Sequence, residues 1–269
     1  MRGDLPLPLV FWKWDGLGND FVLILTPEGP PPEAEALARE LCDRHRGIGA
    51  DGLVFVTPTA GGVGMEIYNA DGSLAQMCGN AIRCVAALGH RESLFQGDRT
   101  EVSTRSGPRE VRILAAPDPW VLQVDMGEPR VLEEAGSLKL GEEFRPCATL
   151  SMGNPHRVVF VEDLDSVNIE QHGPLLERSH PQGLNVEFVR VLGPDHLAVR
   201  VWERGVGLTL ACGTGACAAL VAASMAGLTG RKAQVDLPGG ALEVEWQEDD
   251  RVRLVGPARQ VFRGEYTGC

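Results

Sequence analysis

Short apolar runs, separated by Gly, Pro, Asn and Asp, recur along the whole of this 269-residue chain. Runs of this kind, rich in Val, Ile, Leu and Phe and bounded by turn residues, are typical of β-strands. In the first half they predict strands at 21–25, 53–57, 100–104, 110–114 and 121–126. In the second half they predict strands at 156–161, 185–191, 197–202, 233–237 and 242–246.

Helical patterns are fewer. Residues 32–45 carry apolar side chains four positions apart, which predicts an amphipathic helix. Two further helices, at 80–88 and 214–225, are almost entirely apolar and are expected to end at Gly89 and Gly227. The strands do not alternate with amphipathic helices, so a doubly wound parallel sheet fits poorly. The pattern favours an α+β fold in which each half wraps a curved sheet around a buried helix.

The two halves also resemble each other in sequence. Cys78-Gly79-Asn80 and Cys212-Gly213-Thr214 lie 134 residues apart, and Gly18-Asn19 recurs as Gly153-Asn154 at a separation of 135. In both halves an apolar segment ends nine residues before the cysteine. Several features at nearly one separation indicate two homologous domains.

Pro117 and Pro119 interrupt the pattern near the middle of the chain and place the domain boundary there. The first domain is expected to span 1–117 and the second 118–269. A C-terminal tail from about residue 257 is expected to pack back on the first domain.

The charge balance excludes one class of partner. The chain carries 37 acidic and 25 basic residues, for a net charge of −12, and no basic cluster suited to nucleic acid. The apolar stretch at 5–12 is broken by Pro6 and Pro8, is too short to span a bilayer and lacks the layout of a signal peptide. We therefore expect a soluble cytoplasmic protein that binds neither nucleic acid nor membrane.

Seven cysteines, an odd number, argue against a disulfide scaffold in such a protein. No Cys-x-x-Cys or matching His pair occurs, so no metal site is expected. Most of the thiols are expected to be reduced and to serve only in packing, except the two in the repeated glycine-rich loops. The packing cysteines are Cys42, Cys84, Cys147 and Cys217, and no role is assigned to Cys269.

The two loop cysteines, Cys78 and Cys212, each precede an apolar helix. A helix N-terminus presents free N–H groups and the positive end of the helix dipole, which lowers a cysteine pKa from about 8.5 toward roughly 3.5–7.5. The same N–H groups can hold a carboxylate, and Gly79 and Gly213 leave room for it. Two such thiols around one carbon suit stereoinversion without a cofactor. A single cysteine nucleophile is the competing mechanism, but it gives no reason for a second equivalent cysteine.

Taken together, the motifs resemble those of the diaminopimelate epimerase family, in order and spacing, from about residue 11 to 262. Proline racemases and phenazine-pathway isomerases share the cysteine loops, whereas the Gly-Asn-Pro-His and Glu-Arg-Gly-Val-Gly segments narrow the resemblance. The segments that carry it are Gly18-Asn19-Asp20-Phe21, Gly47 to Gly52, Asn69 to Ser73, Cys78-Gly79-Asn80, Met152 to His156, Trp202 to Gly207 and Ala211 to Ala216.

The resemblance implies a cofactor-independent epimerase that interconverts LL- and meso-2,6-diaminopimelate in lysine and peptidoglycan precursor synthesis, with its active site in the cleft between two domains. Cys78 and Cys212 match the catalytic thiols, and His156 with Glu203 matches a pair that tunes them. Family members are often dimers, so a homodimer is an open alternative to the monomer. The positions that match substrate-binding residues are Asn19, Asn69, Gly79, Asn80, Asn154, Asn185, Glu203, Arg204, Gly213 and Thr214.

Four positions depart from the family pattern: Asp15, Gly52, Gln76 and Leu208. At Gly52 some members use Gln to contact substrate, so that contact is absent here or supplied by water. Asn19, Asn69, Asn154 and Asn185 could instead be turn residues, and Arg204 could form a surface ion pair.

Three other functions stay open from the residues alone. The first is another racemase of the same fold, acting on proline or a related acid. The second is a redox protein in which Cys78 and Cys212 form a disulfide. The third is an amino-acid-binding module without catalysis. The sequence does not assign which cysteine removes the proton from the LL isomer.

Overall fold

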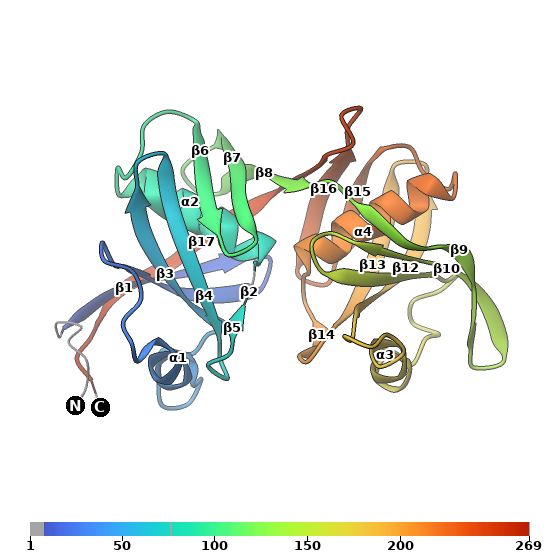
Figure 1. Ribbon diagram of the computed structural model, residues 1–269, viewed down its shortest axis with the longest axis horizontal. Helices are drawn as coiled ribbons and strands as arrows, with labels where there is room; N and C mark the ends of the chain where they lie inside the picture. Colours follow the sequence, from blue (N-terminus) through green and yellow to red (C-terminus); the bar gives the residue numbers. More distant parts are fainter. Residues whose placement is uncertain (1–7, 76, 269) are drawn as a thin grey trace. The chain divides into compact units, whose positions relative to one another are not determined.

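The computed structural model describes residues 8–75 and 77–268. Their contacts divide the chain into two compact units. The first unit comprises the residues up to Val124 together with those from Gly256 onward, and the second unit runs from Asp125 to Val255. Two strands, β8 (Trp120–Gly127) and β17 (Val252–Tyr266), pass from one unit into the other (Figure 1).

The boundary predicted at residues 117–118 lies in the turn between β7 (Gly107–Ala115) and β8. That turn belongs to the first unit, and the contacts divide the chain inside β8. The tail from Gly256 onward belongs to the first unit through β17, which pairs antiparallel with β1 (Leu9–Gly16).

In the first unit, a parallel strand pair occurs wherever a helix separates two strands. β2 (Asn19–Leu25) pairs parallel with β3 (Gly52–Thr59) across the helix α1, and β4 (Gly62–Asn69) pairs parallel with β6 (Arg99–Thr104) across α2. The other pairs are antiparallel: β1 with β2, β3 with β4, β4 with β5, β6 with β7 and β7 with β8. This is expected, because antiparallel strands need only a short turn while a parallel pair needs a crossover. The remaining elements are α1 (Ala34–Cys42), β5 (Leu74–Ala75) and α2 (Gly79–Arg91).

The second unit repeats this order. β11 pairs parallel with β12 across α3, and β13 pairs parallel with β15 across α4, while the other pairs are antiparallel. The repetition explains the sequence similarity of the two halves. The elements are β9 (Arg130–Leu140), β10 (Glu143–Ser151), β11 (Pro155–Phe160), α3 (Ile169–Glu177), β12 (Asn185–Gly193), β13 (His196–Glu203), β14 (Gly207–Thr209), α4 (Gly213–Met225), β15 (Lys232–Leu237) and β16 (Gly240–Trp246).

Each unit encloses one apolar helix. α2 contacts β1, β2, β3, β4, β6 and β7, and α4 contacts the corresponding strands β10, β11, β12, β13, β15 and β16 (Figure 1). Residues 79–89 of α2 and 213–223 of α4 are all buried. A helix with few polar side chains is expected to be buried on most of its surface. The predicted α+β fold, with a mostly antiparallel curved sheet around a central helix in each half, is confirmed.

Gly89 does not end its helix as predicted, because α2 continues to Arg91. A Cβ at Gly89 would lie 2.9 Å from Cγ1 of Val63 and 3.1 Å from Cε1 of Phe95. The glycine therefore serves close packing inside the unit rather than helix termination. The helix predicted at 32–45 is shorter at both ends in the structure, where α1 spans Ala34–Cys42. In the described part of the chain no helix is long and apolar enough to cross a membrane.

The core of the second unit yields a stability prediction. Phe188 of β12 is fully buried, whereas Phe144 of β10 is 70% exposed. Phe188→Ala should lower the free energy of unfolding by about 3–5 kcal/mol, because it removes a buried ring and leaves a cavity. Phe144→Ala, the matched control, should change it by less than about 0.5 kcal/mol. Urea denaturation of the two variants measures both values, and equal losses would contradict the packing described.

Candidate active site

Both loop cysteines immediately precede the central helix of their unit. Cys78 has the extended backbone of an N-cap residue (φ −141°, ψ 117°) before α2, and Cys212 has nearly the same backbone (φ −129°, ψ 111°) before α4. The first turn of a helix leaves N–H groups without intrahelical acceptors. Each sulfur therefore lies beside backbone donors at the start of a buried helix, as the sequence predicts.

In the first unit, Cys78 is half-buried and its thiol donates to Oδ1 of Asn19 at 3.6 Å. Asn80 Nδ2 donates to the same oxygen at 3.2 Å. Asn19 is positioned by the tight turn between β1 and β2, in which Leu17 (φ 64°) and Gly18 (φ 80°) both adopt left-handed backbone. Two successive residues with positive φ make the hairpin turn that aligns its flanking strands.

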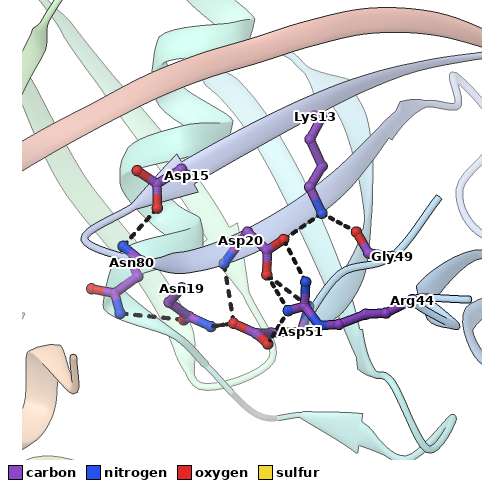
Figure 2. Close-up of polar contacts among 9 residues, drawn as sticks. Lys13, Asp15, Asn19, Asp20, Arg44, Gly49, Asp51 and Asn80 are labelled. Atoms are coloured by element: carbon purple, nitrogen blue, oxygen red, sulfur yellow. Dashed lines mark hydrogen bonds and ion pairs between the residues drawn. The ribbon is translucent and has the colours of Figure 1, made fainter. Parts of the chain in front are cut away.

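A charged network fixes the other end of the Asn19 amide (Figure 2). Asn19 Nδ2 donates to Asp51 at 2.8 Å, and Arg44 donates to both Asp51 (2.8 Å) and Asp20 (2.7 Å). Lys13, which is buried, pairs with Asp20 and donates to the Gly49 carbonyl. Since a carboxylate can only accept, Asp51 holds the nitrogen of Asn19 and turns its oxygen toward Cys78.

These charges depress a carboxyl pKa. Burial raises the pKa of Asp20, but the hydrogen bonds and charges of Arg44 and Lys13 together bring it below its usual 3.8. The network was missed by the sequence reasoning, although the motifs that carried the family resemblance contain Asp20 and Asp51. The available signal was a carboxylate directly after Asn19 and a second one in the Gly-rich segment.

A buried cation completes the first unit's site. Arg83 is fully buried in α2 and donates to Oδ1 of Asn80 at 3.0 Å and to the Gly79 carbonyl at 3.2 Å. Asn80 therefore presents its nitrogen to Asn19. Asp15, a departure from the family pattern, accepts from the Gly18 N–H at 2.6 Å and points toward Asn80 at the start of α2 (Figure 2).

The second unit surrounds its cysteine with different chemistry. Cys212 is only 6% exposed, and its sulfur accepts from the Gly215 N–H at 3.4 Å. Burial raises the pKa of Cys212 well above the usual value, and the carboxyls of Glu203 and Glu187 raise it further; contacts with Thr214 and Gly215 oppose the rise only in part. The expectation that a helix start lowers this pKa is therefore wrong for Cys212, because desolvation and two carboxyls outweigh the backbone donors.

His156 is paired with a carboxylate that sequence reasoning missed. Its Nδ1 lies 2.7 Å from Oε1 of Glu187, and both side chains are fully buried. Its Nε2 donates to Oδ1 of Asn154 at 3.0 Å. That His156 and Glu203 tune the thiols, as the resemblance implies, stays a prediction; the carboxylate in direct contact with His156 is Glu187. The signal for it was an acidic residue inside the otherwise apolar strand predicted at 185–191.

Glu203 lies at the end of β13 and accepts from the Thr209 hydroxyl at 2.6 Å. Burial raises its pKa; His156 lowers it and Glu187 raises it. A side-chain hydrogen bond with Cys212 contributes as well. The structure therefore brings Glu203, Glu187, His156 and Cys212 together in one cluster of ionisable groups, in which Glu203 is half-buried and the other three are buried.

Three other predicted substrate residues make hydrogen bonds within their own unit. Asn69 Nδ2 donates to Ser73 Oγ at 2.9 Å, which supports the turn interpretation. Asn185 is buried and accepts from the Arg204 N–H at 2.9 Å. Arg204 is exposed and donates to the Gln182 carbonyl at 2.9 Å. Substrate contact by these three residues stays a prediction, as it does for Gly79, Gly213 and Thr214 at the two helix starts.

Of the other positions that depart from the family pattern, Gly52 is closely packed and Leu208 is exposed. A Cβ at Gly52 would lie 3.0 Å from the Tyr68 carbonyl oxygen, so the strand pairing leaves little room for a side chain. Leu208 is 50% exposed in β14. Gln76 lies outside the described residues. Among residues 8–75 and 77–268, no group of three or more His, Cys, Asp or Glu side chains could hold a metal ion.

Three of the four cysteines assigned to packing, Cys42, Cys84 and Cys217, are more deeply buried than Cys78. Cys84 and Cys217 are fully buried inside the central helices, and burial raises the pKa of Cys84 strongly. Burial raises the pKa of Cys42 to about 12. Cys147 is half-buried in β10, and burial raises its pKa too. Cys269 lies outside the described residues.

Comparison with known proteins identifies close relatives. A family model described as diaminopimelate epimerase matches residues 11–132 and 148–261. A diaminopimelate epimerase of Pelotomaculum thermopropionicum is 45% identical, in a match that covers 95% of this chain and 98% of the relative. One of Desulforudis audaxviator is 47% identical with the same coverage, and one of Synechocystis is 44% identical over 96% of this chain and 99% of the relative.

More distant solved structures share the fold. A hydroxyproline epimerase from Agrobacterium vitis, with bound trans-4-hydroxy-L-proline, superposes with a TM-score of 0.76 at 14% identity, covering 96% of this chain and 92% of its own. A phenazine biosynthesis protein from Bacillus anthracis gives a TM-score of 0.72 at 15% identity, covering 96% of this chain and 98% of its own. At these identities the likeness concerns the fold alone.

The network beneath Asn19 predicts a pH-dependent loss of stability. A carboxyl with a lowered pKa stabilises the fold above its unfolded value of 3.8, and this contribution disappears as the pH falls through the folded value. Asp20→Asn should therefore be less stable than the wild type by about 1–2 kcal/mol at neutral pH. The difference should shrink below pH 3.8. Chemical denaturation at pH 7 and pH 3 checks this, and a difference that grows toward low pH would contradict it.

Proposed function

The chain belongs to the diaminopimelate epimerase family, and we propose that Cys78 and Cys212 are the two bases with which it interconverts LL- and meso-2,6-diaminopimelate. The observation that carries this proposal is the equivalent position of the two sulfurs, each on the N-cap residue of a buried central helix. One fold element, used twice, supplies two acid–base groups of the same kind.

The proton balance of the reaction requires both thiols. One thiolate removes the α-proton, so that the C–H bond breaks, an S–H bond forms and the electron pair stays on the α-carbon. The other thiol then donates its proton to the opposite face of that carbon and becomes a thiolate. The product is the inverted stereocentre, and the protein now has its proton on the first sulfur. Each proton transfer by a positioned group contributes about 10²–10⁴-fold to the rate.

The carbanion is the high-energy species, and its charge spreads onto the neighbouring carboxylate. We assign Gly79-Asn80 and Gly213-Thr214 to hold that carboxylate, because the N–H groups of a first helical turn point at an anion and need no reorganisation. This stabilisation comes from groups of the chain itself, and the two-base route needs no electron-withdrawing cofactor.

The remaining polar residues are assigned to the two ends of the substrate. Diaminopimelate carries an ammonium and a carboxylate at each end, so both hydrogen-bond acceptors and donors are needed. Arg204 suits the distal carboxylate through its planar fork. Glu203 suits an ammonium group. Asparagines can serve either, and those assigned are Asn19, Asn69, Asn154 and Asn185.

We also propose a cytoplasmic location, because both thiols must stay reduced to exchange protons. The oligomeric state is proposed as monomer or homodimer, to be decided by the mass of the protein in solution.

Removal of either sulfur tests the two-base scheme. Cys78→Ala and Cys212→Ala should each lower kcat for LL-diaminopimelate by about 10²–10⁴-fold, because each lacks one proton-transfer group. Turnover is measured by formation of the meso isomer in deuterated water, with deuterium incorporation at the α-carbon as a second readout. Cys147→Ala, which removes another half-buried cysteine away from the helix starts, is the control and should keep wild-type turnover. Wild-type turnover in either loop variant would disprove the scheme.

Thiol labelling gives an independent prediction. Iodoacetamide should alkylate Cys78 faster than Cys84 or Cys217, because the latter two are fully buried in the helices. Added meso-diaminopimelate should slow the labelling of Cys78, since the substrate covers the sulfur that acts on it. Peptide mass spectrometry measures the rate at each position. Equal rates at all three cysteines, or no protection by the substrate, would count against the assignment.

A further inference from the structure

The ionisable groups of the two halves occupy different positions on equivalent backbones. By the separations of the repeat, His156, Glu187 and Glu203 of the second unit correspond to Phe21, Val54 and Asn69 of the first. The strand registers agree, because His156 lies opposite Asn185 as Phe21 lies opposite Gly52. Cys212 therefore has three ionisable neighbours at positions where the half containing Cys78 has none.

Glu187 is the least expected member of this cluster. It is fully buried in β12, and its Oε2 has no hydrogen-bond partner among the described residues. Its Oε1 contacts His156 and lies 2.7 Å from the point that a Cβ on Gly215 would occupy. The Cys212 sulfur lies 3.3 Å from that same point. The carboxyl group and the sulfur thus flank the first turn of α4, and Gly215 is a glycine because they fill the space.

Resting on the assignment of Cys212 as one of the two bases, we propose that Glu187 is a positioning residue that orients His156 and keeps Cys212 protonated as a thiol in the substrate-free protein. It acts through the imidazole and through its charge. It does not touch the substrate.

The first part of this role follows from the contacts of the imidazole. An amide oxygen only accepts, so the contact with Asn154 requires a proton on Nε2 of His156. The 2.7 Å contact on the other side holds a second proton between Nδ1 and Oε1 of Glu187. Glu187 therefore fixes the rotation of the ring and directs its Nε2–H toward Asn154. Through Asn154, this sets the orientation of an amide assigned to the substrate.

The second part follows from electrostatics. A thiolate at Cys212 would be a buried anion facing the carboxyl groups of Glu187 and Glu203, with the charge of His156 shared with Glu187. Like charges at short distance in a low-dielectric site disfavour ionisation. The other strands packed on α4 are β10, β15 and β16, and their ion pairs lie at exposed or partly exposed positions. These pairs are Arg145 with Glu143, His196 with Asp236 and Lys232 with Glu243.

Glu187→Gln isolates the charge. Glutamine has the same size, and its amide oxygen can accept the hydrogen bond from the Nδ1 proton of His156, so the ring keeps its place and both its protons while the negative charge of the carboxylate is lost. Asp236→Asn is the matched control, because Asp236 also lies 2.7 Å from a histidine, His196, but that pair is partly exposed. Both variants are made in the full-length chain.

The experiment measures the rate of iodoacetamide labelling against pH, without substrate, at the Cys212 and Cys78 peptides separately. In Glu187→Gln the midpoint for Cys212 should fall by about 1–3 pH units relative to the wild type, since removing a close like charge favours the thiolate. The midpoint for Cys78 should not change, and Asp236→Asn should leave both midpoints at their wild-type values. An unchanged or raised midpoint for Cys212 in Glu187→Gln overturns the proposal.

Glu187→Asp covers the case in which the glutamine variant fails to fold, which a thermal melt detects. Aspartate keeps the charge, so the midpoint for Cys212 should stay within about half a pH unit of the wild type; a fall of a full unit or more overturns the proposal. An epimerase assay on the wild-type protein separates the two hypotheses. Absence of turnover would refute the proposed function, whereas the labelling curves still decide whether Glu187 controls the Cys212 proton.

Discussion

The burial of an apolar helix from its first residue is the constraint on which the rest of this structure depends. A helix exposed at its N-terminus leaves its first N–H groups to water. α2 and α4 are buried from Gly79 and Gly213 onward, so their first turns must find acceptors in the protein or in a ligand. In the second unit the Cys212 sulfur accepts one of these N–H groups. A helix start that is buried in this way and rich in N–H donors also suits a carboxylate or a carbanion.

The two halves meet this constraint with the same backbone and different charges. Beneath Asn19 the first unit places Asp20 and Asp51, which form ion pairs with Lys13 and Arg44. At the positions corresponding to Asp20 and Asp51 the second unit has Pro155 and Leu184. It carries its own acids close to the sulfur instead. The strand order and the helix are thus shared, while the proton chemistry of each cysteine is set by a few side chains on neighbouring strands.

Much of the architecture could be predicted from the sequence because it follows from local pattern. Alternation and turn residues predicted ten strands, the two mostly apolar helical segments predicted the buried helices, and the repeat predicted the correspondence between Cys78 and Cys212. Gly89 was misread because a glycine that ends a helix and one that permits close packing look alike in sequence; only the neighbours Val63 and Phe95 tell them apart. β9 was not predicted because four of its eleven residues are charged, which hides the apolar pattern.

The site was less predictable because its electrostatics depend on distance. The sequence located Cys212 at a helix start and predicted a lowered pKa, but this rule describes a solvated helix end. Whether the dipole or the desolvation dominates depends on how deeply the sulfur is buried and on which carboxyls lie across the strands. Glu187 comes from a different strand, so no motif spacing connects it with the cysteine. It becomes relevant only when β12 and α4 are packed together.

Unequal surroundings for the two thiols have a consequence for a two-base reaction. The productive protein carries one proton on the pair of sulfurs, since a protein with two protons has no base and one with none has no acid. If the two thiols had the same pKa, the form with one proton would prevail only in a narrow pH range. Half of the molecules in that form would carry the proton on the sulfur that has to act as the base for a given substrate isomer. Different ionisation midpoints widen that range and fix where the proton rests. Glu187 and Glu203, whose counterparts in the first unit are Val54 and Asn69, raise the pKa of Cys212 without altering the backbone that both halves share.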